Sequence, residues 1–81
     1  MDMAAFAEKL RRNPSKGEDL ITIQDLILGT EESKSPNSEK ALNGLRQAQT
    51  SILNEDFKKA ATAVGTASIL FKGGKAGIIE R

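Results

Sequence analysis

Apolar residues recur at steps of three and four along the C-terminal half of the chain, from Ala41 to Phe71. This spacing is typical of one face of an α-helix, and here it continues for many helical turns. The run from Leu20 to Leu28 is rich in β-branched residues, but no second run of that kind exists with which it could pair as a strand. The sequence therefore predicts an all-α protein.

Proline, glycine and capping residues set the predicted boundaries of the helices within a single small domain. The predicted segments are a helix over 1–12, a loop over 13–19, a helix over 20–29, a linker over 30–37, a long helix over 38–72 and a glycine-rich tail over 73–81. A break of the long helix near residue 54 is the alternative. We expect two short N-terminal helices and a long C-terminal helix, arranged as a helical hairpin or small bundle.

The composition limits how much core such a domain can build. The chain has 81 residues, 4% aromatic residues and no cysteine, so neither large rings nor disulfides can add much stability. Either the chain folds as a modest helical bundle, or oligomerisation or a partner completes it. The composition favours the second of these.

The apolar face of the long helix consists mostly of small side chains, with a phenylalanine at each end. Small side chains let another helix approach closely, either within the chain as an antiparallel pair or between copies of the chain or with a partner helix. The length of the helix and the scarcity of large hydrophobic residues elsewhere favour the second interpretation. The predicted interface comprises Phe57, Ala60, Ala61, Val64, Gly65, Ala67 and Phe71.

The charges are unevenly distributed, since residues 17–39 are acidic and residues 57–81 are basic. This pattern suits pairing within one chain or between neighbouring copies, or simply solvated helix surfaces. The basic residues Lys72, Lys75 and Arg81 are candidate anion contacts. The glycines beside them do not form a phosphate-binding loop, because Ile69 and Ala76 stand where that motif has Gly and Ser or Thr.

The absence of histidine and cysteine removes the commonest general base and the thiol nucleophile. No spacing places a serine, aspartate or lysine nucleophile beside an activating base, and the adjacent acidic residues do not match a calcium loop. The sequence thus predicts no enzyme, no catalytic residue, no metal, no cofactor and no small-molecule substrate. Nucleic-acid binding is disfavoured, because no aromatic side chain accompanies the basic tail.

No signal peptide is visible, and the longest uncharged run, Ala60 to Phe71, is shorter than the roughly 20 residues that span a bilayer. We expect a chain that is not transmembrane. It would be cytoplasmic at synthesis, and either part of an assembled particle or exported without a cleaved signal.

The run Asn13-Pro14-Ser15, followed by Leu20, Gln24 and Leu28, resembles the turn and helix of small helical-hairpin subunits of type III secretion needles and inner rods. The segment after Pro36 and the glycine-rich tail depart from that pattern, so the sequence assigns no family. The Ala/Gly-rich composition is also similar to that of small structural components of phage particles.

These features favour a small structural or assembly subunit that packs helix on helix in a homo-oligomer, filament or larger particle of the virion or secretion-apparatus type. Its partner would then be further copies of itself. The alternative is a small regulatory adaptor or inhibitor that binds one protein partner.

Overall fold

Four helices make up the part of the chain that the computed structural model describes, which is residues 2–33 and 37–79, with side chains up to residue 71. They are α1 (Met3–Arg12), α2 (Lys16–Ser33), α3 (Ser38–Leu53) and α4 (Phe57–Ile79). No strand occurs among these residues. The predicted all-α class is therefore confirmed.

The predicted layout of two short helices and one long helix is wrong. The second helix begins at Lys16 and continues through Gly29 to Ser33, so its 18 residues exceed the 16 of α3. A glycine inside a helix costs only about 1 kcal/mol, which burial on the same helix can offset. Thr30, the residue after Gly29, is buried and its hydroxyl donates to the carbonyl of Leu26, at 2.7 Å.

The long predicted helix is divided into α3 and α4 by a turn over residues 54–56. The sequence left open a break near residue 54, but it did not predict that α4 folds back against α3. The amides of Glu55 and Asp56 donate to the carbonyls of Ile52 and Ser51, at 2.9 and 2.8 Å, which is the pairing of a Schellman motif. Glu55 has a positive φ of 61°, the conformation that reverses the chain after a helix. Asp56 then caps α4, since its carboxylate accepts from the amide of Lys59.

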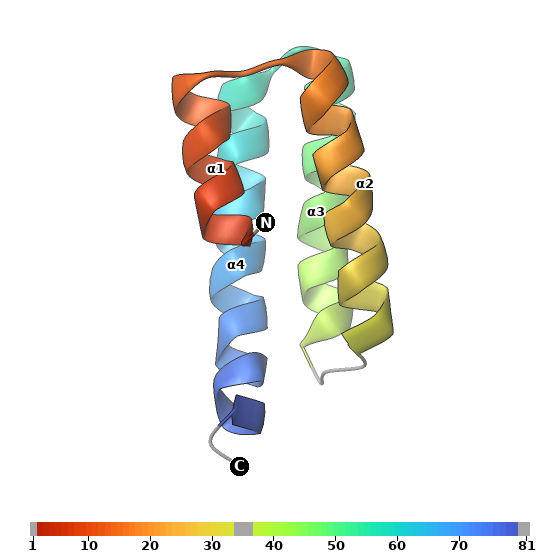
Figure 1. Ribbon diagram of the computed structural model, residues 1–81, viewed down its shortest axis with the longest axis vertical. Helices are drawn as coiled ribbons and strands as arrows, with labels where there is room; N and C mark the ends of the chain where they lie inside the picture. Colours follow the sequence, from red (N-terminus) through yellow and green to blue (C-terminus); the bar gives the residue numbers. More distant parts are fainter. Residues whose placement is uncertain (1, 34–36, 80–81) are drawn as a thin grey trace.

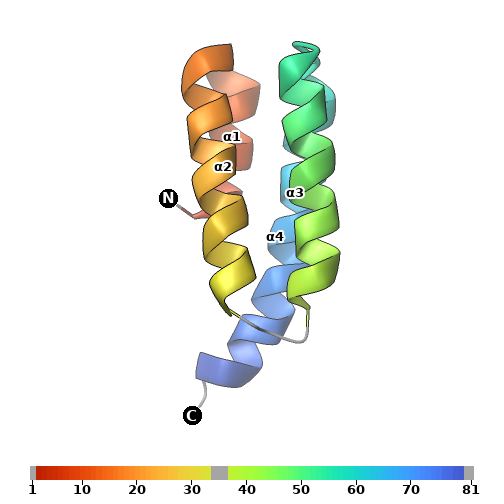
Figure 2. The same cartoon turned by 90° about the vertical axis from the view of Figure 1, so that its right-hand side faces the viewer.

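The helices form a bundle in which α4 packs against both α3 and α1, and α2 packs against α3. Figure 1 shows α1 beside α4 on one side of the bundle and α2 beside α3 on the other. Seen from the side in Figure 2, α4 extends beyond the other helices at its C-terminal end. It continues through Gly73 and Gly74, where the sequence predicts an end, because glycine disfavours a helix without forbidding it.

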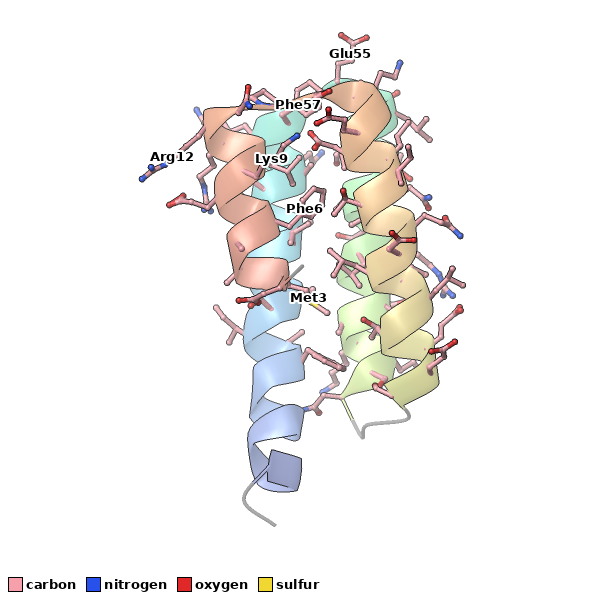
Figure 3. All side chains as sticks on the ribbon, in the orientation of Figure 1. Met3, Phe6, Lys9, Arg12, Glu55 and Phe57 are labelled. Carbon is pink, nitrogen blue, oxygen red and sulfur yellow. The ribbon has the colours of Figure 1, made fainter. Side chains whose placement is uncertain are left out.

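The core lies between the four helices and draws on all of them. In α1 and α3, the faces on which apolar residues recur at helical spacing are the faces that are buried. The largest fully buried apolar side chains are Phe6, Leu10, Ile23, Leu45, Ile52 and Val64. In Figure 3, Phe6 and Met3 project from α1 toward α2, whereas Arg12 points away from the bundle.

Candidate interaction surface

The structure places the predicted interface residues in or beside the chain's own core. Ala60, Ala61, Val64 and Ala67 are fully buried, and Phe57 and Phe71 are partly buried against the same cluster. Gly65 is half-buried on the side of α4 that lies next to α1. Lys72 and Lys75 lie in the part of α4 whose side chains are not described, and Arg81 lies outside the described residues.

Small residues bring α3 and α4 close together inside one chain. A Cβ added to Gly44 would lie 3.2 Å from the Cβ of Ala67 and 3.3 Å from the carbonyl oxygen of Ala63. Contacts this short are tighter than nine in ten real Cβ contacts, so the neighbouring atoms would have to shift by a few tenths of an ångström. The antiparallel helix pair within the chain is therefore the arrangement that these small residues form.

A buried ion pair fixes the corner between α1 and α2. The Asp19 carboxylate is fully buried and accepts from the Lys9 ammonium of α1 and, at 2.8 Å, from the backbone amide of Ser15 at the start of α2. Figure 3 shows Lys9 reaching from α1 toward the first turn of α2. This pair is structural, because Asp19 is enclosed and accepts hydrogen bonds from this chain alone.

Glu18 and Asp19 are adjacent acidic residues, which are ordinarily both solvated, but Asp19 is buried. The signal that identifies it is periodicity, because Asp19 precedes Ile23 by four residues and Ile27 by eight, on the same helix face. Both isoleucines are buried. Glu18, one residue earlier, points to solvent.

Large apolar side chains are exposed on one side of the bundle. Ile21 and Leu28 of α2 are 68% and 47% exposed, and Leu53 of α3 is 53% exposed. Ile21 and Leu28 are seven residues apart, so they lie two helical turns from each other on one face of α2. These are the features of a candidate interaction surface rather than of a catalytic site.

Two hydrogen bonds fix how these residues lie relative to one another. The Gln49 side chain of α3 donates to that of Gln24 of α2, and Arg46 of α3 donates to Glu31 of α2, both at 3.1 Å. Because the helices are antiparallel, Leu53 and Ile21 lie one turn beyond the glutamine pair in the same direction. Leu28 lies between the two hydrogen bonds.

We name this surface the α2/α3 patch, and its members share one outer face of the bundle. They are Ile21, Gln24, Leu28, Gln49 and Leu53. Its rim is acidic, since Asp25 and Glu32 are exposed and each stands four residues after an exposed apolar residue of α2. Arg46, the cation on the rim, is already paired with Glu31.

A shallow depression lies between α3 and α4. It is lined by Gln47, Thr50, Ser51, Lys59 and Ala63. Lys59 is its sole ionisable side chain, so it has no pair of groups that could exchange a proton. No group of three or more acidic side chains within the described residues is placed to hold a metal ion.

No protein-family model, curated protein or solved structure matches this chain. None of the helices over residues 2–33 and 37–79 is both long enough and apolar enough to cross a membrane. The surface itself is therefore the basis for a functional proposal.

Proposed function

We propose that this chain is a non-enzymatic structural subunit that assembles with further copies of itself, and that the α2/α3 patch is the surface that binds. The observation that carries the proposal is the exposure of Ile21, Leu28 and Leu53 together on one outer face. Single exposed apolar residues are ordinary on a protein surface, whereas several on one face, with a polar rim, are typical of a binding site.

Within the described residues, the bundle buries an apolar core of its own. Apolar residues from all four helices are buried in one cluster, and no buried side-chain nitrogen or oxygen among the described residues lacks a hydrogen-bond partner. Assembly would therefore join folded subunits through their outer surfaces. The small-residue face of α4 would contribute to the stability of each subunit.

The size of the patch favours weak association that depends on concentration. Fully burying an isoleucine or leucine side chain contributes about 1.5–3 kcal/mol, and these residues are already partly buried in the subunit. That gain must offset the loss of rotational and translational freedom on binding. A particle in which each subunit has more than one neighbour gains from every such contact.

The paired substitution Ile21→Ser and Leu28→Ser tests the patch. We expect at least about a tenfold weaker self-association by sedimentation equilibrium, because two apolar side chains no longer leave water on binding. The unfolding temperature should change little, since both side chains are exposed in the subunit. Far-UV circular dichroism on the same samples checks that the helices remain.

The matched control is Asn43→Ser with Gln47→Ser, two exposed positions four residues apart on α3 and outside the α2/α3 patch. This variant should associate as the unmodified chain does. If the Ile21→Ser/Leu28→Ser variant also associates as strongly as the unmodified chain, the α2/α3 patch is not the binding surface.

A further inference from the structure

We infer that the α2/α3 patch of one copy binds the opposite side of the next copy, the outer face shared by α1 and α4, so that subunits join head to tail. This inference rests on the proposed function, because it names the partner surface for the same patch. Figure 1 shows the α1 and α4 pair on the side of the bundle that lies away from α2 and α3.

The outer face of α1 and α4 also carries an exposed apolar side chain. Ile69 is 74% exposed, the largest value among the exposed large apolar residues. It lies on one face of α4 with Lys58, Thr62 and Gly65, because these residues follow one another at steps of four, three and four. Its exposure leaves the Ile69 side chain able to enter a facing surface.

The neighbouring α1 supplies positive charge to this face. The Arg11 guanidinium is the group nearest to Gly65, at 4.0 Å from the position of an added Cβ, so Arg11 lies at the α1 and α4 boundary. Arg11 and Arg12 both contact the single carboxylate of Glu8, at 3.8 and 3.7 Å. With Lys58 exposed on α4, cations outnumber carboxylates here. We name this surface the α1/α4 face; its members are Glu8, Arg11, Arg12, Lys58, Thr62, Gly65 and Ile69.

The α2/α3 patch and the α1/α4 face each carry exposed apolar side chains, and their charges are of opposite sign. The α2/α3 patch has the acidic rim of Asp25 and Glu32, and the α1/α4 face presents Arg11, Arg12 and Lys58. Opposite charges across an interface favour binding and fix its register. A two-fold dimer of patch on patch would instead place the acidic rims together, and like charges in contact oppose binding.

A head-to-tail contact has a consequence for the assembly. Each subunit that binds through one face leaves the opposite face free for another copy, so growth stops only if a ring closes. A two-fold contact would stop at the dimer. The arrangement on opposite sides of the bundle thus favours an open filament or a ring.

Charge reversal on each face separately, followed by mixing, tests this inference on the full chain. The first variant, Asp25→Lys with Glu32→Lys, makes the rim of the α2/α3 patch basic. The second, Arg11→Glu with Lys58→Glu, makes the α1/α4 face acidic. We expect each variant alone to associate at least about tenfold more weakly than the unmodified chain, and an equimolar mixture to recover association, because every contact in it again joins opposite charges.

Three results would overturn the inference, and they are distinguishable in sedimentation velocity. If the α1/α4 variant alone assembles as the unmodified chain does, that face is not the partner surface. If the unmodified chain stops at a dimer, the contact is two-fold. If the unmodified chain stays monomeric at every concentration, the proposed function fails and this inference fails with it. Circular dichroism of each variant confirms that the helices are retained.

Discussion

Replacing Lys9 by methionine should lower the free energy of unfolding by about 3 kcal/mol, which is a large part of the total stability of this chain. A domain of 81 residues has on the order of 4–12 kcal/mol of stability in total. Lys9→Met leaves the fully buried Asp19 carboxylate without its counter-charge, with the Ser15 amide as its remaining donor. Removing one partner of a buried ion pair costs about 3–5 kcal/mol, and the partial exposure of Lys9 places this case at the lower end.

The control for this prediction is the same substitution at an exposed ion pair. Lys16→Met removes the contact with Glu55, in which the charged groups are 3.6 Å apart and both side chains are exposed. Such pairs contribute about 0–1 kcal/mol, so urea unfolding should show a much smaller loss than for Lys9→Met. Equal losses for the two variants would mean that the Lys9 and Asp19 pair does not hold the α1 and α2 corner.

Replacing Gly44 by leucine should destabilise the bundle by about 1–3 kcal/mol. Overpacking a core typically costs about 1–3 kcal/mol, and here even the first added carbon lies 3.2 Å from the Cβ of Ala67 and 3.3 Å from a backbone oxygen of α4. The remaining atoms of leucine have to push α3 away from α4. Thermal unfolding followed by circular dichroism measures the loss.

Gly29→Leu is the matched control, since nothing lies within 4 Å of a Cβ added at Gly29 in α2. Leucine favours a helix more than glycine does, so this variant should be as stable as the unmodified chain or more stable. An unchanged unfolding temperature for Gly44→Leu would show that α3 and α4 are not in close contact at this position.

The sequence predicts the helical class and the small-residue face, but it does not show which helix covers that face. The spacing of Ala60, Val64 and Ala67 places them on one face of a helix, against which another helix can pack. That second helix could belong to this chain or to another. The feature that indicates a helix of this chain is a second stripe of small residues in α3, where Ala41, Gly44 and Ala48 follow one another at steps of three and four. Two stripes of small residues complement each other across a close antiparallel contact.

The exposed patch could not be predicted because the run Leu20 to Leu28 is apolar on more than one face. Ile23 and Ile27 are buried, whereas Ile21 and Leu28 in the same run are exposed. All of them have comparable hydrophobicity, so periodicity alone cannot say which pair faces the core. Tertiary contacts determine which face of α2 is buried. Asp19 and Ile23 lie on the buried face, whereas the hydrogen bond from Gln49 to Gln24 lies at the exposed side.

The layout of the helices departs from the prediction for a related reason. Gly29 and Gly73 are of the residue type that commonly ends a helix, yet α2 continues through Gly29 and α4 through Gly73. The true end of α3 is at a turn where Glu55, a residue with no special tolerance for positive φ, adopts that conformation. Single glycines thus indicate a boundary less reliably than the backbone hydrogen bonds that close it.

Sedimentation velocity of the unmodified chain, over a hundredfold range of concentration, tests the central claim most directly. Self-assembly through two opposite faces predicts a sedimentation coefficient that rises continuously with concentration and passes the value of a dimer. A single helical monomer across the whole range would contradict the claim. That result would leave the α2/α3 patch as a surface for a different protein.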